Sequence, residues 1–327
     1  MSARARPIWN ICLENVGLGN ELADAGMSTI AIHYWMTPAV TLACAALFGL
    51  LIGSFLNVVI HRLPLMMQAQ WEADAAQLDT AQPAAVDART ATTFASTANE
   101  PAPFNLVVPR SRCPQCGHQI TADENIPVVS WLWLRGRCSA CKARISPRYP
   151  LIEVLSGTLA LASIWQYGLT TAGVAAAFLC FALIALAFID IDTQLLPDDI
   201  TLPLLWAGLL LNLFGGFASL QDAVIGAMVG YLLLWGIYWL FKLLTGKEGM
   251  GYGDFKLLAA LGAWFGWQAI PAIILLASVV GASVGIALMI VARHGRDVPI
   301  PFGPYLAGAG ALTLFFSKPL MALYGLG

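Results

Sequence analysis

From Pro150 to its end the chain is an almost unbroken succession of apolar segments, separated only by short polar turns. A segment of about 20 apolar residues is long enough to span a bilayer. Only 11% of the residues are charged, whereas an ordinary soluble domain has about 25%. The sequence therefore predicts an all-α polytopic membrane protein with about eight transmembrane helices, over residues 38–62, 151–167, 172–190, 200–217, 223–244, 256–268, 269–292 and 303–325.

Lysine and arginine indicate how these helices are oriented. Of the seventeen basic residues, nine lie at 62–148, three at 242–256 and two are Arg293 and Arg296. With eight crossings all these stretches lie on one side of the membrane, which the positive-inside rule makes the cytoplasm. The N-terminus is then outside. The segment at 256–268 is shorter than a complete crossing requires, so seven crossings is the alternative.

A polar region at 63–149 interrupts the apolar sequence and is rich in tryptophan and cysteine. Within it, residues 68–103 are rich in Ala, Gln, Thr and Asp, which is typical of a flexible insertion. Residues 1–29 are mixed in composition and lack the apolar core of a cleavable signal peptide. We therefore expect an N-terminal extension (1–37), a first transmembrane helix (38–62), a small cytoplasmic domain (63–149) and helices 2–8 (150–327).

The cytoplasmic domain contains two Cys-x-x-Cys pairs, Cys113 with Cys116 and Cys138 with Cys141. This spacing is typical of a four-thiolate zinc site. Two disulfides or redox pairs are the alternative, but cytoplasmic thiols stay reduced. Because four protein ligands leave no open coordination position, we expect the zinc to be structural.

Two acidic residues stand at the ends of apolar segments. Asp190 ends one, and Asp254 follows the glycine-rich stretch Gly249–Gly253 and begins another. An acidic residue at a bilayer edge is a candidate for function, although Asp254 as a helix N-cap is the alternative. If the two approach each other they share a proton, as in aspartic proteases. Asp192 faces a different way from Asp190 on a helix, and Asp198 is interpreted as an N-cap.

Two other functions use the same features. A proton-coupled membrane transporter could use Asp190 and Asp254 as a relay, but transporters bind near the midplane and both acids lie at one edge. A non-catalytic assembly scaffold would leave the two acids without a role. The basic residues at 135–148 are explained by the anionic inner leaflet, so no nucleic-acid partner is expected.

Several stretches of the sequence together carry a resemblance to a known family. They are Gly53–Pro64, the two cysteine pairs, Glu124–Pro127, Arg148–Glu153, Asp190–Asp192, Leu195–Asp198, Thr245–Leu258 and Pro301–Pro304. In combination these stretches resemble the type IV prepilin peptidases, which are bacterial aspartic membrane proteases of the GxGD type. The resemblance covers roughly residues 38–325 and leaves out 1–37 and 68–103.

This resemblance implies an enzyme of the bacterial inner membrane with Asp190 and Asp254 as its catalytic residues. Such an enzyme cleaves the basic leader peptide from type IV prepilins and type II secretion pseudopilins on the cytoplasmic side. It also N-methylates the new N-terminal residue, with S-adenosylmethionine as methyl donor. The resemblance implies prepilins, pseudopilins and the lipid bilayer as partners. The residues that bind the methyl donor are unknown from the sequence.

Overall fold

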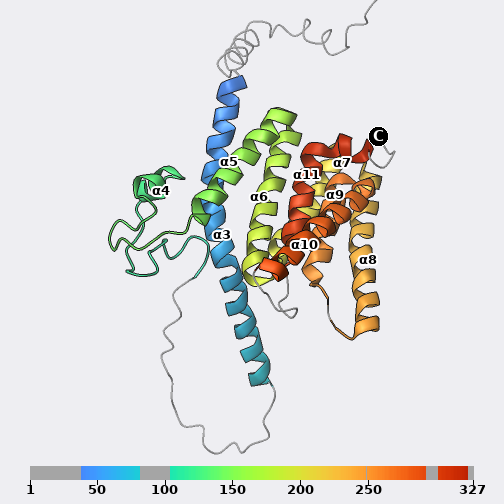
Figure 1. Ribbon diagram of the computed structural model, residues 1–327, viewed down its shortest axis with the longest axis horizontal. Helices are drawn as coiled ribbons and strands as arrows, with labels where there is room; N and C mark the ends of the chain where they lie inside the picture. Colours follow the sequence, from blue (N-terminus) through green and yellow to red (C-terminus); the bar gives the residue numbers. More distant parts are fainter. Residues whose placement is uncertain (1–37, 82–103, 248, 292–300, 323–327) are drawn as a thin grey trace, which may run out of the picture.

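The computed structural model describes residues 38–81, 104–247, 249–291 and 301–322 (Figure 1). The extension at 1–37, the segment 82–103 and the basic residues Arg293 and Arg296 lie outside them. In the described ranges the regular elements are α3 (Pro38–Ala81), η1 (Asp123–Asn125), α4 (Val129–Trp133), α5 (Arg148–Tyr167), α6 (Thr171–Thr193), α7 (Asp198–Leu213), α8 (Leu220–Thr245), α9 (Tyr252–Phe265), η2 (Trp267–Ala269), α10 (Ile270–Val291) and α11 (Gly303–Ala322).

Four stretches of the described chain are long and apolar enough to cross a membrane. They are Pro38–Leu78, Thr171–Thr193, Leu220–Thr245 and Trp267–Ile290. The other apolar segments expected from the sequence coincide with α5, α7, α9 and α11. The 14 residues of α9 make a helix about 21 Å long, which is shorter than the hydrocarbon core of a bilayer. The structure thus confirms the all-helical fold, and its four candidate spans suit a membrane protein.

Helix α3 differs from expectation in its length. It continues past residue 62 through Pro64 and reaches Ala81, so the beginning of the segment expected to be a flexible insertion is helical. The reason lies in its composition, because residues 66–81 are mostly Met, Gln, Glu, Ala and Leu, which are strong helix formers. The expected boundary between the first helix and the cytoplasmic domain at residue 62 therefore does not coincide with the end of a helix.

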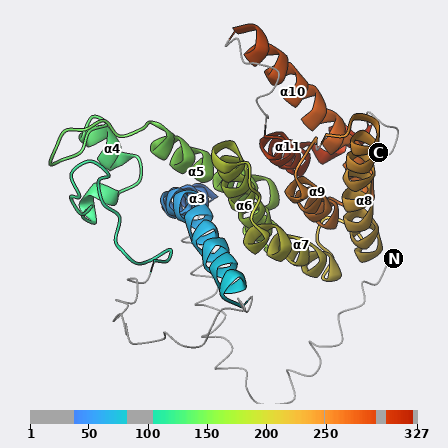
Figure 2. The same ribbon diagram turned by 90° about the horizontal axis from the view of Figure 1, so that it is seen from below.

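The helices form two packed groups that share α6. On one side α3 and α5 pack together and against α6, and on the other α6 packs against α11 and α7 (Figures 1 and 2). Small residues allow α3 and α5 to approach closely, as expected for membrane helices. A Cβ added at Gly49 would lie 2.7 Å from Ala160 Cβ, and one added at Gly53 would lie 2.6 Å from Glu153 Cα.

Helix α9 is the most enclosed element of the second group. It packs against α7, α8 and α11, and from Asp254 to Phe265 every residue except Lys256 is buried. Asn212 of α7 donates hydrogen bonds to the carbonyls of Ala263 and Trp264 at the end of α9, which satisfies groups that a helix C-terminus leaves unpaired. The acidic residue at the start of α9 therefore belongs to a helix that is packed along its length and anchored at its far end.

The segment between α3 and α5 forms a small domain, residues 104–147, which we call the tetracysteine domain. Two buried charged side chains hold it against the helices. Arg62 of α3 donates to the carbonyls of Asn105 (2.9 Å) and Pro109 (2.6 Å). Glu153 of α5 accepts the Val128 amide at 2.7 Å. Buried charged groups of this kind are costly unless hydrogen-bonded, so both contacts fix the position of the domain.

Candidate active site

Asp190 lies in the last turn of α6 and is only 5% exposed. Its Oδ2 accepts a hydrogen bond of 2.9 Å from the amide of Gly303, the first residue of α11. The N-terminus of a helix carries partial positive charge and favours an anion. A Cβ at position 303 would lie 2.6 Å from the same oxygen, so only glycine brings this amide so close to the carboxylate.

Asp254 is the third residue of α9 and is 6% exposed. The interpretation as an N-cap is wrong, because Gly251 is the N-cap residue and no side chain caps this helix. Its Oδ1 is buried and has no hydrogen-bond partner among the described residues. A buried carboxylate oxygen without a partner is unfavourable, so this atom is available to bind a water molecule or a reacting group.

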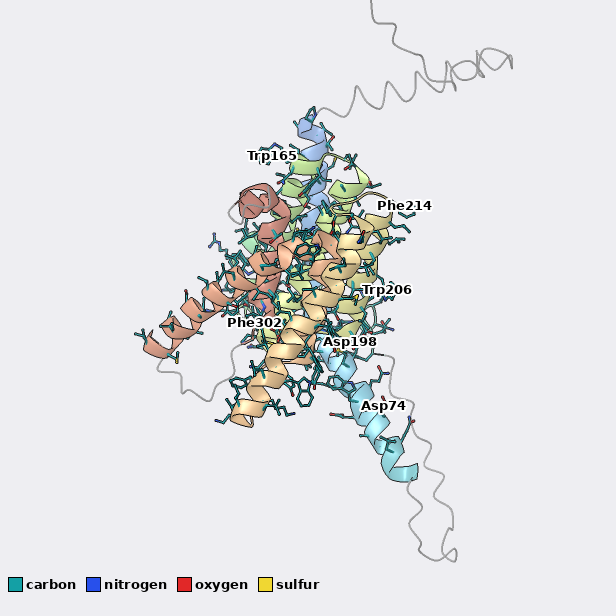
Figure 3. The ribbon with its side chains drawn as sticks, turned by 90° about the vertical axis from the view of Figure 1, so that its right-hand side faces the viewer. Asp74, Trp165, Asp198, Trp206, Phe214 and Phe302 are labelled. Carbon is teal, nitrogen blue, oxygen red and sulfur yellow. The ribbon has the colours of Figure 1, made fainter. Side chains whose placement is uncertain are left out.

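The fold brings the two acids together at one end of the bundle. Leu196, in the turn after α6, packs between the start of α9 and the start of α11. A Cβ added at Gly253 would lie 2.6 Å from Leu196 Cβ, and a Cβ added at Gly303 would lie 3.2 Å from Leu196 Cδ1. Asp190 is close enough to Asp254 for the two carboxylates to interact electrostatically. Phe302 and Asp198 are seen toward this end in Figure 3, and Trp165 and Phe214 toward the other.

Two other acids near Asp190 and Asp254 form salt bridges with basic side chains. Asp192 is exposed and forms a bidentate salt bridge with Arg148, whose two terminal nitrogens lie 2.6 Å from Oδ1 and 2.7 Å from Oδ2. Asp198 begins α7, where Pro197 is the N-cap, and both of its oxygens bind Lys256 Nζ at 2.7 Å. The interpretation of Asp198 as an N-cap is therefore wrong, and its role is to connect the starts of α7 and α9.

The three glycines before Asp254 have different surroundings. A Cβ at Gly249 would lie 2.8 Å from the Phe241 ring, and Gly253 lies against Leu196. Gly251 has open space around it, with Asp254 Oδ2 at 4.0 Å from its added Cβ. None of the three adopts a positive φ. Two of these glycines are therefore required for close packing, and the third leaves free space beside the carboxylate.

The four cysteines of the tetracysteine domain come together as a candidate metal site. Their sulfur atoms all lie within 4.8 Å of one another. The Sγ–Sγ distances are 3.8 Å for Cys113 and Cys141 and 4.0 Å for Cys116 and Cys138. A disulfide requires about 2.05 Å, whereas a tetrahedral zinc with Zn–S distances of about 2.3 Å places its sulfurs about 3.8 Å apart. The residues therefore fit a zinc ion bound by four thiolates.

The backbone around each cysteine pair repeats the same turn. The amide of Gly117 donates to Cys113 O and that of Lys142 donates to Cys138 O, and both donors have positive φ. Amides of Cys116 and Gln115 lower the pKa of the Cys113 thiol to about 6, and amides of Cys141 and Ala140 lower that of Cys138. Hydrogen bonds of this kind favour the thiolate, which is the form that binds metal.

His118 and Glu124 strengthen the same domain. His118 Nε2 lies 3.2 Å from Glu124 Oε2, which also accepts the Thr121 amide. Hydrogen bonds from the Ser139 side chain and the Thr121 amide lower the pKa of Glu124 to about 2. His118 is thus hydrogen-bonded to an acid and is outside the group of metal-ligand candidates.

Sequence reasoning missed Gly303 as part of the site. The signal was present, because Gly303 lies in the stretch Pro301–Pro304, which resembles the family, but nothing in that stretch shows which acid it contacts. It also missed Arg148 as the partner of Asp192, although Arg148 lies in another such stretch. The Gly303–Asp190 contact is a backbone hydrogen bond, and the Arg148–Asp192 contact is a salt bridge. Each joins helices that are distant in sequence, so only the packing of α5, α6 and α11 reveals them.

Comparisons with known proteins find relatives of this chain over most of its length. Residues 47–167 match the model of the bacterial peptidase A24 N-terminal domain, and residues 177–286 match that of the type IV leader peptidase family. The chain is 57% identical to a prepilin leader peptidase/N-methyltransferase of Aeromonas hydrophila, over 85% of this chain and 91% of that protein. It is 54% and 50% identical to proteins of the same name from Stutzerimonas stutzeri and Pseudomonas aeruginosa, each over 88% of this chain and 94% of the relative.

No solved structure matches the chain. The two family models together cover α5, most of α6 and all of α7–α9, and they include both acids and all four cysteines of the tetracysteine domain. They leave out α11, which provides the amide that binds Asp190. On the matched family model and the high identity over most of its length, the chain belongs to the type IV leader peptidase family.

Proposed function

We propose that this chain cleaves the leader peptide from type IV prepilins and type II secretion pseudopilins and N-methylates the new N-terminal residue. The two activities are those in the name of its relatives, prepilin leader peptidase/N-methyltransferase. The observation that carries the peptidase assignment is the pair of buried acids at one end of the bundle, Asp190 and Asp254. The transporter and the scaffold find no support in these relatives.

The two acids divide the work of peptide hydrolysis through one shared proton. We place the negative charge on Asp190, because the Gly303 amide at the start of α11 donates to it. Two buried carboxylates that interact electrostatically do not readily ionise together, so Asp254 carries the proton. Asp190 then removes a proton from a water molecule, whose oxygen attacks the scissile carbonyl carbon, while Asp254 gives its proton to the carbonyl oxygen.

The second half of the reaction restores both acids. The tetrahedral diol collapses as one of its hydroxyl groups returns a proton to Asp254. The carbon–nitrogen bond breaks, and the leaving nitrogen takes the proton that Asp190 holds. The free space beside Gly251 gives the backbone of an extended substrate room to approach Asp254. The products are the released leader and a pilin with a free N-terminal amine.

The N-terminal amine is the group that becomes methylated. The name of the relatives implies a methyl donor, for which we propose S-adenosylmethionine, which supplies the methyl group when bound. We assign no residue to it. Zinc bound by Cys113, Cys116, Cys138 and Cys141 would join the two halves of the tetracysteine domain. Only Gly136 and Cys138 are buried in this domain, so it has little apolar core of its own.

We propose eight membrane crossings, in which α5, α7, α9 and α11 accompany the four candidate spans in a bacterial inner membrane. The basic residues of 62–148 and 242–256 support an orientation with the tetracysteine domain and both acids facing the cytoplasm. This side suits a substrate whose leader stays in the cytosol while its apolar segment lies in the bilayer.

The assignment is tested by co-expressing the chain with a prepilin and reading cleavage and methylation together by mass spectrometry. We expect Asp190→Asn and Asp254→Asn each to reduce cleavage to background, and the double variant to be no worse, because the pair acts as one unit. Asp192→Asn is the matched control, since it changes an exposed acid two residues away on the same helix. A folded, zinc-loaded Asp190→Asn or Asp254→Asn protein that still cleaves prepilin would refute the assignment.

A further inference from the structure

The tetracysteine domain exposes an apolar surface around α4, formed by Ile126, Val129, Leu132 and Trp133. Trp133 is 84% exposed and Leu132 is 62% exposed, and Val129 and Ile126 are also exposed. Residues three and four apart lie on the same face of a helix, so Val129 is adjacent to Leu132 and Trp133. Large apolar side chains grouped on a surface mark a site of interaction with a protein or a membrane.

The same segment has a second face that holds the domain together. The Trp131 ring packs over Gly136, where an added Cβ would lie 2.9 Å from it, and its Nε1 donates to Ile145 O at 3.3 Å. The Val128 amide donates to buried Glu153 of α5. These contacts fix which way α4 turns, so the exposed side chains point outward because the inward positions are already used.

The charge of the domain indicates what its apolar surface contacts. If the cysteine thiolates are left out of the count, the charged residues of 104–147 are six arginines and lysines and two acids. Arg135 follows Trp133 closely, and Arg135, Lys142 and Arg144 are all exposed. Tryptophan and arginine or lysine together are typical of segments at a membrane interface, where the ring lies at headgroup level and the cation binds phosphate.

The position of α4 fits the same partner. Figure 1 shows α4 beside α3 and the first turns of α5, not beyond the end of the helical bundle. Figure 2, seen from below, places α4 across α3 and α5 from the α6–α11 group. The tetracysteine domain is held to these helices by Arg62 and Glu153. The domain therefore lies at the side of α3 and α5, away from the α6–α11 group.

We propose that the tetracysteine domain rests on the cytoplasmic leaflet through this face. Trp133 and Leu132 enter the boundary between headgroups and acyl chains, and Val129 and Ile126 line its edge. Arg135, Lys142 and Arg144 bind the phosphates of anionic lipids. The contact fixes the domain relative to the bilayer as well as to α5.

The test uses the full chain reconstituted in bilayers of phosphatidylethanolamine and phosphatidylglycerol. A photoreactive residue is introduced as Trp133→p-benzoylphenylalanine and, as a matched control, as Gln115→p-benzoylphenylalanine. Gln115 is exposed on the first cysteine turn and is polar. We expect lipid adducts at position 133 to exceed those at position 115 at least tenfold after irradiation. Equal yields, or no lipid adduct at 133, overturn the proposal.

Two further measurements separate lipid from a protein partner and from misfolding. Irradiation in the presence of prepilin that moves the adducts at 133 from lipid to prepilin overturns the proposal in favour of a substrate surface. The triple variant Arg135→Gln, Lys142→Gln, Arg144→Gln should reduce the phosphatidylglycerol share of the adducts several-fold while zinc content stays at the wild-type level. An unchanged phosphatidylglycerol share in a zinc-loaded protein overturns the role of these cations.

Discussion

At the scale of single residues, the carboxylate of Asp190 has room for a backbone amide but for no side chain at position 303. The amide of Gly303 lies 2.9 Å from Oδ2, and an added Cβ would lie 2.6 Å from the same atom. Glycine is therefore needed here for its lack of a side chain. Asp192, two residues further along α6, differs from Asp190 in that its side chain is exposed and forms a salt bridge with Arg148.

Gly303→Ala is therefore expected to displace the Asp190 carboxylate. A misplacement of about 1 Å in a reacting group can reduce the rate roughly 100-fold, and we expect a loss of that order in prepilin cleavage. Gly308→Ala is the control, since it changes a glycine of the same helix with no atom within 4 Å of the added Cβ. Cleavage assays in membranes, with equal expression of both variants, make the comparison. Similar activity of the two variants would remove Gly303 from the site.

At the scale of helices, the position of Asp254 depends on how α9 packs against α8. The two backbones touch: a Cβ at Gly226 of α8 would lie 2.4 Å from the carbonyl oxygen of Gly262, and one at Gly262 would lie 2.2 Å from that of Gly226. Trp264 fixes α9 to α7 from the other side through a 2.8 Å hydrogen bond to Leu204 O. Because α9 is buried on nearly all faces, any shift of α8 moves Asp254.

Gly226→Ala is expected to destabilise this crossing by about 1–3 kcal/mol, the usual effect of overpacking a core. The matched control is Gly236→Ala on the same helix, where an added Cβ meets nothing within 4 Å. Alanine is about 1 kcal/mol better than glycine inside a helix, so the control should be neutral or slightly stabilising. Thermal unfolding in detergent measures both variants, and equal destabilisation would contradict the close crossing.

At the scale of the whole molecule, the chain has two parts that meet at α6. Leu56, Ile152 and Ile189 belong to the core of α3, α5 and α6, while Leu186, Leu258 and Leu306 belong to the core that extends through α11. The acids lie with the second core, and the tetracysteine domain is attached to the first. The two family models divide the chain at nearly the same place.

This division predicts the effect of removing zinc. We expect one zinc per chain, and none in the Cys113→Ser, Cys138→Ser double variant. A strong chelator should make residues 104–147 sensitive to protease while α6–α11 remain resistant, because their core contains no residue of the tetracysteine domain. Metal analysis and limited proteolysis measure both effects. A metal-free wild-type protein, or a disulfide mapped between these cysteines, would contradict the zinc site.

The orientation of the molecule is tested by reporters at four positions. Fusions at residues 130 and 247 should be active only with a cytoplasmic reporter, because the positive-inside rule predicts that the basic stretches around both are cytoplasmic. Fusions at residues 169 and 218, in the turns before α6 and α8, should be active only with a periplasmic reporter. Periplasmic activity at 130 or 247 would overturn both the orientation and the cytoplasmic location of the acids.

Most helices of this protein, the four cysteines and the two candidate acids could be predicted from the sequence alone. Long apolar segments, the spacing of four cysteines and an acid at the end of an apolar segment are all features of residues close together in the sequence. They can therefore be recognised without knowledge of the fold. The coincidence of the expected segments with α5–α11 follows from this, because helix formation depends on residues close in sequence. The long extension of α3 departs from this expectation because the helix propensity of residues 66–81 outweighs a composition that is otherwise typical of disorder.

Which of these residues lie near one another could not be predicted from the sequence, because it depends on how the helices pack. Asp190 and Asp254 are 64 residues apart, and their approach depends on the packing of α6, α9 and α11 through Leu196 and Gly303. The different surroundings of Asp190, Asp192 and Asp198 likewise come from partners on distant helices, Gly303, Arg148 and Lys256. The pattern of apolar residues along a helix does not identify these partners. A helix such as α9, which is buried on nearly all faces, has no polar face, so its sequence does not show which side contacts which neighbouring helix.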